Sequence, residues 1–268
     1  MSQQNKGTAL ITGSSSGIGA IYADRFARRG YDLILVARDK TKLDALAAKL
    51  SKETGRKVDV LAADLNSKAD VRRVEDRLKS DQSITALVNN AGVGSAGPLL
   101  TSNVDDMDAM IQLNVVALTR LALAAAPAFV ARKSGLIINI ASIVALDTDV
   151  LNGTYSGTKA YVVNFTQALH KEFKDSGVRV QAVLPGATAT NFWDVAGVPV
   201  AHLPEGIVMQ ADEMVDASLV GLDFGELITI PSLPDVKEWE SYDAARKALT
   251  PKLSRTHAAD RYKKKNAA

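Results

Sequence analysis

The sequence of 268 residues contains no cysteine and only three histidines. The absence of cysteine excludes disulfide bonds, thiol catalysis and thiolate metal sites. The histidines, His170, His202 and His257, have none of the short spacings of metal-ligating pairs, so we expect no metal site. We interpret His202 as a structural residue.

Charge of one sign is not in excess either. The 32 Lys and Arg stand against 30 Asp and Glu, which gives a formal net charge of +2 at pH 7. This balance provides no electrostatic attraction to nucleic acid or to an anionic membrane, so we expect neither as a partner.

Long hydrophobic runs are also lacking. The longest, Leu121 to Val130, is shorter than the roughly 20 residues that cross a bilayer, and it contains Pro127. The polar residues 1–7 do not resemble a signal peptide. We therefore expect a cytoplasmic protein with no membrane partner and, at the lysine-rich residues 263–268, a frayed end.

Short apolar segments alternate with longer segments of helical character. Such alternation is typical of βαβ units, in which helices cover both faces of a parallel sheet. We predict an α/β fold, a Rossmann-type, doubly wound, seven-stranded and mainly parallel sheet. The expected strands are 8–12, 31–38, 58–65, 84–90, 136–142, 178–184 and 226–230. The expected helices end near residue 29, follow Asp39 to about 54, cover about 67–80 and 104–133, and run through Tyr155 to about 175.

We expect one domain, residues 1–268, because no segment between residues 8 and 190 has the composition of a linker. Two additions are expected. The first is a substrate-loop insertion at about 190–225, apolar and interrupted by Gly and Pro. It is typical either of a lid over an apolar carbonyl compound or of ordinary packing against the C-terminal tail. The second is a helical tail at about 233–268.

A glycine-rich loop, Gly13-Ser14-Ser15-Ser16-Gly17-Ile18-Gly19, follows the first strand and precedes a helix. Glycines let a backbone turn tightly and approach a pyrophosphate, and a helix N-terminus offers free N–H groups to it. The spacing differs from G-x-G-x-x-G, and a plain turn between strand and helix is the alternative. We predict that all seven residues bind a dinucleotide.

The end of the second strand indicates which dinucleotide this is. Enzymes for NAD place a carboxylate here, but this chain has Ala37 and Arg38. Arginine suits the 2′-phosphate of NADP, whereas the alternative is an exposed surface charge. We interpret Asp39 as a helix cap and predict that NADPH is preferred over NADH, with Ser14 or Ser15 as further donors.

Tyr155 and Lys159 are four residues apart, which places both side chains on one face of a helix. An ammonium beside a phenol favours the phenolate and lowers the pKa of the tyrosine. A general acid acts best with its pKa near the working pH. The alternative is a solvated helix that carries both residues by chance.

These motifs together resemble the short-chain dehydrogenase/reductase family. The resemblance covers about residues 8–190 and rests on motifs in the family's order and spacing. They are Thr12-Gly-x-x-x-Gly-x-Gly19, Asn89-Asn-Ala-Gly92, Asn114, Ser142, Tyr155-x-x-x-Lys159 and Pro185-Gly186.

The resemblance implies an NADP-dependent oxidoreductase that interconverts a carbonyl compound and a secondary alcohol. Tyr155 would be the proton donor or acceptor, Lys159 would lower its pKa and hold the nicotinamide ribose, and Ser142 would orient the substrate oxygen. Asn114 would expose a backbone carbonyl that holds a water molecule. The alternative function is a non-catalytic dinucleotide sensor or scaffold on the same fold.

The resemblance also implies further cofactor contacts and an assembly. Besides the glycine loop, Arg38, Tyr155 and Lys159, the expected cofactor-binding residues are Asp64, Leu65, Asn90, Ala91, Gly92, Pro185, Gly186 and Thr188. The family commonly assembles through two long helices, and the segment Leu118 to Val130 is apolar on most faces. We therefore expect a homodimer or homotetramer, although the tail puts the tetramer in doubt.

Overall fold

Seven parallel strands form the central sheet in the computed structural model, which describes residues 5–149 and 151–263. Their order is β3-β2-β1-β4-β5-β6-β9, and all six neighbouring pairs are parallel. The strands are β1 (Thr8–Thr12), β2 (Asp32–Ala37), β3 (Val58–Ala62), β4 (Ile84–Asn89), β5 (Gly135–Ile140), β6 (Val178–Val183) and β9 (Ile228–Thr229). This is the doubly wound order, so the predicted fold is confirmed.

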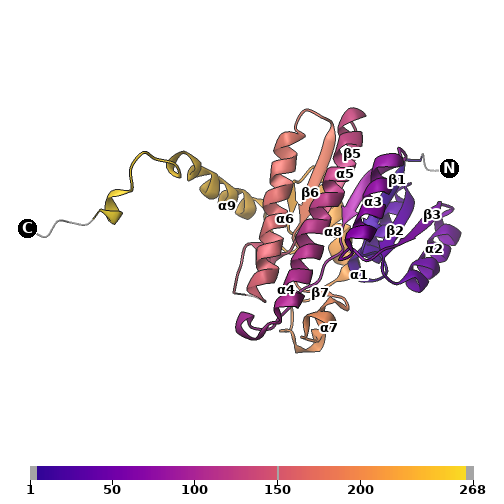
Figure 1. Cartoon of the computed structure of the whole chain (residues 1–268), viewed down its shortest axis with the longest axis horizontal. Coiled ribbons are helices and arrows are strands. Elements are labelled where there is room, and N and C mark those ends of the chain that lie inside the picture. The colour runs from indigo at the N-terminus through magenta and orange to yellow at the C-terminus, as the bar shows by residue number, and fades with distance from the viewer. Residues whose placement is uncertain (1–4, 150, 264–268) are drawn as a thin grey trace, which may run out of the picture. The chain divides into compact units, whose positions relative to one another are not determined.

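Helices cover both faces of this sheet (Figure 1). The side chains of each strand alternate between the faces, so that Leu10 belongs to one hydrophobic cluster and Ile11 to the other. The first face carries α3 (Lys68–Ser80), α5 (Leu118–Ala131) and α6 (Gly153–Glu172). The second carries α1 (Gly17–Arg28), α2 (Lys40–Thr54) and α8 (Ala211–Phe224).

Side-chain caps begin several of these helices. Asp39 accepts a hydrogen bond from the backbone N–H of Lys42 at 3.1 Å and so starts α2, as predicted. Asn152 accepts from the N–H of Thr154 at 2.8 Å and starts α6 just before Tyr155. Helix positions next to the carboxyl edge of the sheet are thereby fixed by local sequence.

The long helix expected at 104–133 is interrupted. It consists of α4 (Val104–Ile111), a π-helical segment (Gln112–Ala117) and α5. By length and composition alone, the whole stretch Val104–Ala131 could cross a membrane, so the run Leu121 to Val130 gave too short a length for the apolar helix. Half (50%) of its most apolar part is buried inside the fold, as in the core helix of a sheet protein.

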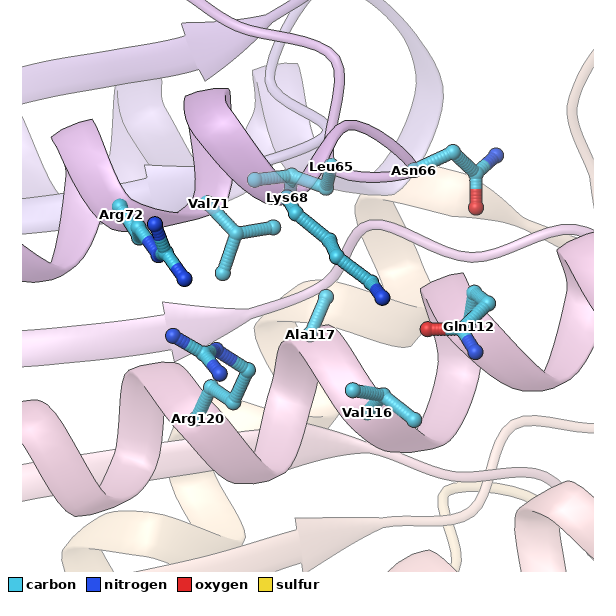
Figure 2. Close-up of a pocket in the computed structure, with 9 residues that line it drawn as sticks. All are labelled: Leu65, Asn66, Lys68, Val71, Arg72, Gln112, Val116, Ala117 and Arg120. Atoms are coloured by element: carbon cyan, nitrogen blue, oxygen red, sulfur yellow. The ribbon is translucent and has the colours of Figure 1, made fainter.

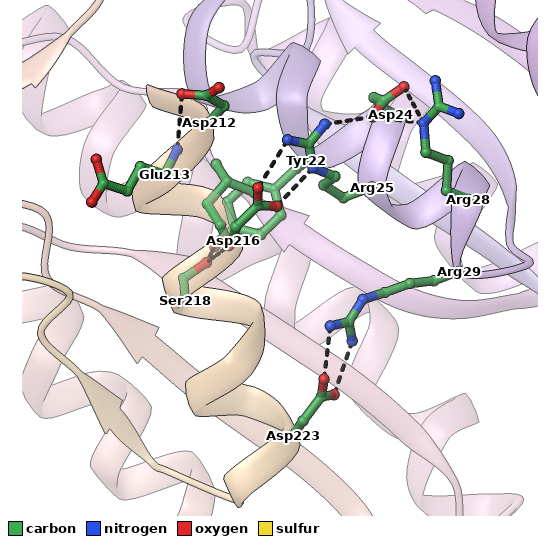
Figure 3. A network of polar contacts seen from close by, with 11 residues as sticks. Tyr22, Asp24, Arg25, Arg28, Arg29, Asp212, Glu213, Asp216, Ser218 and Asp223 are labelled. Carbon is green, nitrogen blue, oxygen red and sulfur yellow. Dashed lines mark hydrogen bonds and ion pairs between the residues drawn. The ribbon is translucent and has the colours of Figure 1, made fainter. Parts of the chain in front are cut away.

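The substrate-loop insertion was predicted at about 190–225, and this range wrongly includes α8, a helix of the core. Met214 and Leu219 of α8 are buried in the same cluster as α1, and the Tyr22 and Ser218 hydroxyls are hydrogen-bonded across the two helices. Two exposed ion pairs, Arg25–Asp216 and Arg29–Asp223, join the same helices (Figure 3). Helix α8 is therefore part of the core, and the insertion ends with β8 (Met209–Gln210), which pairs with β7 (Thr188–Ala189).

The chain divides at Pro231 into two compact units, so the tail is separate from the domain in which we had included it. The second unit contains α9 (Val236–Ala248), capped by Asp235, and no residue of α9 is buried. Residues 264–268 of the predicted tail lie outside the described residues. The short 3₁₀ turns of the chain are Leu99–Thr101, Ile143–Ala145, Val200–His202, Thr250–Lys252 and Asp260–Tyr262.

Replacement of Met214 tests whether α8 is core. Its side chain is fully buried, so Met214→Ala should lower the free energy of unfolding by about 2–5 kcal/mol. The control Asp223→Asn removes an ion pair whose carboxylate is 54% exposed and should cost less than about 1 kcal/mol. Denaturant unfolding measures both. If Met214→Ala left the stability unchanged, α8 would not be part of the core and would belong to the substrate-loop insertion.

Candidate active site

The four predicted catalytic residues meet at the carboxyl edge of the sheet. Ser142 follows β5, Tyr155 and Lys159 lie in α6, and Asn114 lies in the π-helical segment. All four are buried. Ser142 is hydrogen-bonded to the hydroxyl of Tyr155, and Nζ of Lys159 lies 5.6 Å from the centre of the Tyr155 ring.

Burial sets the protonation of this pair. It raises the pKa of Tyr155 well above its usual value, and the hydrogen bond with Ser142 opposes this only in part. Burial also lowers the pKa of Lys159 to about 8. In the protein alone, burial therefore outweighs the lowering of the Tyr155 pKa that we expected from Lys159, and the net shift is upward. The ammonium is turned to the backbone carbonyl of Ile140, to which it donates at 2.9 Å.

Asn114 fastens the loop after β4 to the catalytic helix. Its amide oxygen accepts from the N–H of Val93 at 3.0 Å, and its amide nitrogen donates to the Val93 carbonyl at 2.8 Å and to the Thr158 hydroxyl at 3.1 Å. These bonds satisfy a buried polar side chain in an apolar helix. A π-helical turn often marks a functional site. The water-holding role of its backbone carbonyl stays a prediction.

The glycine loop lies beside this centre. A Cβ atom on Gly13 would lie 2.9 Å from Cα of Ala91, and one on Gly92 would lie 3.1 Å from Oδ1 of Asn114 and 3.5 Å from Nζ of Lys159. The loop, the segment after β4 and Lys159 therefore lie side by side. At Gly13 only glycine fits without displacing its neighbours, whereas at Gly92 a side chain would require a small shift of Asn114.

The residues of the loop fit a phosphate group. Ser16 precedes α1 and makes no side-chain cap to it within the described residues, in contrast to Asp39 at α2. The first N–H groups of α1, at Gly17, Ile18 and Gly19, therefore keep their donors for a ligand. Backbone donors with a positive helix end are the chemistry that a pyrophosphate requires.

One assignment near the loop is corrected. The Asn90 side chain donates to the backbone carbonyls of Thr12 at 2.9 Å and Gly13 at 3.2 Å, so it holds the loop in place, and its contact with the cofactor stays a prediction. The Ser14 hydroxyl is fully buried and donates to the Val36 carbonyl at 3.4 Å, which removes it as a donor to a 2′-phosphate. Ser15 is half-buried and stays a candidate.

Arg38 and Asp64 lie near the ends of adjacent strands, since the N–H of Ala63 bonds to the carbonyl of Ala37 at 2.9 Å. Arg38 is exposed and forms no ion pair with any described residue. Asp64 bonds within its own turn, to the N–H of Asn66 at 3.0 Å, and Leu65 is buried. The residues predicted to bind the adenosine part of the cofactor therefore lie near the guanidinium of Arg38, which no described residue pairs.

The segment after β6 also reaches the centre. The Ser142 hydroxyl donates to the Pro185 carbonyl at 3.4 Å, and the N–H of Ile143 donates to the same atom at 3.0 Å. Thr188 donates to the Gly186 carbonyl at 3.1 Å. Pro185, Gly186 and Thr188 are therefore placed beside the catalytic serine, as the sequence motif predicts.

The apolar floor of the site was missed by the sequence reasoning. Met110, Val144 and Tyr155 form a buried cluster, against which Val93, Met107, Leu151 and Phe192 pack. The Phe192 ring lies 5.7 Å from the Tyr155 ring, in α7 (Phe192–Ala196). The Phe192–Trp193 pair was a visible signal, but its position over Tyr155 depends on tertiary packing.

The lid hypothesis for this segment needs correction at Trp193. A lid residue becomes less exposed when ligands bind, but only 7% of Trp193 is exposed already. Its indole N–H donates to the Thr188 carbonyl at 2.9 Å. Phe192 alone keeps partial exposure, so movement over Tyr155 stays a prediction for that side chain.

A hollow on the first helical face lies outside this centre (Figure 2). It is lined by the start of α3 and by the π-helical segment and α5, with Lys68, Arg72 and Arg120 at its rim. None of the four catalytic candidates lines it. Arg120 is occupied by an ion pair with Glu75 at 2.6 Å, whereas Leu65, a predicted cofactor contact, also lines the hollow.

Fold and site together define a Rossmann-type α/β protein with a buried Ser–Tyr–Lys centre beside a glycine loop. The short chain dehydrogenase family model matches residues 7–197. A very-long-chain 3-oxoacyl-CoA reductase from Bos taurus is 36% identical over 192 residues, which are 68% of this chain and 59% of that protein. The chain belongs to the short-chain dehydrogenase family.

Solved structures agree over nearly the whole chain. A short-chain dehydrogenase from Sphingobium yanoikuyae in complex with NADPH is 50% identical, with a TM-score of 0.93 over 96% of this chain and 100% of that one. A bulky-bulky ketone specific alcohol dehydrogenase from Comamonas testosteroni is 45% identical, with a TM-score of 0.89 over 97% of this chain and 99% of that one. By contrast, the chain spans about 60% of the length of the first curated relative it matches.

Burial of Lys159 predicts how stability varies with pH. Its pKa is lowered in the folded protein to about 8 from 10.5, so between these values the unfolded chain binds more protons. The free energy of unfolding should therefore rise with pH through this window, by about 2 kcal/mol between pH 7 and 9.5. Lys159→Met removes the titrating group and should lack this rise. If the free energy of unfolding changed with pH equally in the two proteins over this range, the lowered pKa of a buried Lys159 would be contradicted.

Proposed function

We propose that the protein is an NADP-dependent oxidoreductase that interconverts a carbonyl compound and a secondary alcohol. The observation that carries the proposal is the buried group of Ser142, Tyr155 and Lys159 next to the glycine loop. A dinucleotide sensor would need the loop but not a buried tyrosine that is hydrogen-bonded to a serine. The names of the similar proteins, a ketone-specific alcohol dehydrogenase and a 3-oxoacyl-CoA reductase, support the enzyme.

Protonation of the site favours reduction of a carbonyl. Tyr155 keeps its proton at neutral pH because burial raises its pKa, so it is ready to donate to a carbonyl oxygen. Ser142 orients that oxygen through its hydroxyl. When Tyr155 gives up its proton, the nearby ammonium of Lys159 stabilises the phenolate. The cofactor, with its pyrophosphate at the glycine loop and its nicotinamide ribose at Lys159, would supply the hydride.

The floor around Tyr155 supports an apolar organic substrate. Two methionines, Val144 and Phe192 surround the phenol, and few polar groups converge there apart from Ser142. Such a lining suits a small carbonyl compound with apolar substituents.

A homo-oligomer is supported by apolar side chains that the sheet does not cover. Leu123 is 54% exposed and Val130 is 38% exposed on α5, and Val116 on the π-helical segment is 36% exposed. A contiguous apolar face of this kind favours a partner helix. Light scattering at micromolar concentration should give at least a dimer, and a monomer mass would refute it.

The cytoplasmic location also stays a proposal, to be tested by fractionation of cells.

Removal of the Tyr155 hydroxyl tests the proposed chemistry. Tyr155→Phe keeps the buried ring but removes the proton donor, so kcat should fall by roughly 10²–10⁴. Binding of NADPH, measured by fluorescence titration, should change little. Retention of more than about a tenth of the wild-type kcat would assign the proton to another residue. A wild-type protein that binds NADPH but reduces no carbonyl compound would favour the sensor.

Arg38 provides the test of cofactor choice. One or two hydrogen bonds from a charged donor to the 2′-phosphate predict a preference for NADPH of about 10- to 1000-fold. The double change Ala37→Asp with Arg38→Leu should reverse this preference, because it adds repulsion and removes attraction. Arg38→Lys keeps the charge without the fork and should reduce the preference only in part. Equal affinity of the wild type for both cofactors would make Arg38 a surface charge.

A further inference from the structure

The chain segments around the catalytic centre have an unusual charge. They follow the carboxyl ends of β4, β5 and β6, and we name residues 91–119, 141–158 and 185–210 the substrate-side segments. None of the chain's 32 Lys and Arg lies in them. Arg120 and the buried Lys159 directly follow the first and second segments, and they are engaged by Glu75 and by the Ile140 carbonyl respectively. The segments contain seven carboxylates, which are Asp105, Asp106, Asp108, Asp147, Asp149, Asp194 and Glu205. His202 is their single basic residue.

These carboxylates are all exposed, and none forms an ion pair with a residue in the described part of the chain. Elsewhere on the same unit, several exposed carboxylates are paired, as Asp216 is with Arg25 and Asp223 with Arg29. The chain as a whole carries a net charge of +2, so the negative charge is local to the substrate-side segments.

Each substrate-side segment contributes to the apolar floor beneath Tyr155. Met107, Val144 and Phe192 come from the first, second and third segment respectively, and all belong to the cluster around the phenol. A carboxylate lies close to each of them in the chain. Asp106 directly precedes Met107, Asp147 follows Val144 by three residues, and Asp194 follows Phe192 by two. The segments that form the apolar floor of the catalytic centre therefore also carry these exposed carboxylates, which we name the acidic surround.

We propose that this acidic surround selects substrates by charge, so that the enzyme reduces uncharged carbonyl compounds and discriminates against anionic ones, coenzyme A thioesters included. The inference rests on the proposed function and deepens it. A coenzyme A thioester carries several phosphate charges outside the reacting carbonyl, and phosphates are bound by Arg, Lys or free backbone N–H groups. The substrate-side segments supply no Lys or Arg, which separates this chain from what the name of the Bos taurus relative describes.

Electrostatic repulsion of this kind acts on the encounter between substrate and site. Charges that line one approach change association rates by roughly 10- to 1000-fold, and the effect falls steeply with ionic strength. At about 10 mM salt the screening length is roughly 30 Å, so all seven carboxylates act together on an incoming anion. An uncharged substrate of the same shape meets only the apolar floor.

Two matched substrate pairs test the proposal with wild-type protein and NADPH. Acetoacetyl-coenzyme A and the N-acetylcysteamine thioester of acetoacetate share the same reacting ketone, and 4-acetylbenzoate and its methyl ester differ by one charge. The neutral member should have a kcat/KM at least about tenfold higher at low salt, and added salt should narrow the gap. Equal or higher kcat/KM for the anionic members would overturn the inference while leaving the proposed function intact.

A triple variant assigns the effect to the substrate-side segments. Asp106→Asn, Asp147→Asn and Asp194→Asn together remove one negative charge from each segment, and the ratio of neutral to anionic kcat/KM should fall severalfold. The matched control Asp76→Asn, Glu172→Gln and Asp175→Asn removes three exposed carboxylates outside these segments and should leave the ratio unchanged. An equal fall in both variants would overturn the inference. A wild type that reduces no member of either pair would overturn the proposed function and this inference with it.

Discussion

The burial of a phenol and an ammonium on one face of α6 is the constraint on which this site depends. Tyr155 and Lys159 are 6% and 5% exposed, so each is held in its neutral form more firmly than in water. Two neighbours meet part of this cost. Ser142 is hydrogen-bonded to the phenol, and the Ile140 carbonyl accepts from the ammonium. The strand end, the turn after it and the helix must therefore keep their mutual positions for the pair to persist.

The same constraint explains why so many polar side chains near the site bond to backbone. Asn114 joins the loop after β4 to α6, and Asn90 joins that loop to the glycine loop. Each of these amides replaces water that burial has removed. The consequence is a rigid frame in which a protonated tyrosine faces an apolar floor, a state suited to giving a proton to a carbonyl oxygen. The acidic surround then decides which carbonyl compounds approach.

Most of the fold could be predicted from the sequence because parallel strands that are buried on both faces consist of apolar runs, and helices separate these runs. The strands were expected correctly, and Asp39 was identified as a cap from local sequence alone. The errors came from contacts between distant residues. Helix α8 was assigned to a loop because its partner α1 lies about 190 residues away, as in the Arg25–Asp216 bond. The π-helical segment depends on Asn114 bonding to Val93 and Thr158, which no local pattern reveals.

The catalytic residues were predicted by motif, but their electrostatics were not. Spacing along a helix gives the distance between Tyr155 and Lys159. From this distance alone, we expected an attraction that lowers the pKa of the phenol. Burial is invisible at that stage, and in the folded protein it outweighs the attraction. The bond from Asn90 to the backbone of Thr12 was missed for a similar reason, since the two residues are 78 positions apart.

The most direct test of this account is an ultraviolet difference titration of the six tyrosines in the protein without cofactor, compared with Tyr155→Phe. If burial controls the site, the two proteins gain tyrosinate absorbance identically up to about pH 10, because Tyr155 stays protonated throughout. An additional ionisation near neutral pH in the wild type would show that Lys159, and not burial, sets the pKa of Tyr155, and would contradict the account.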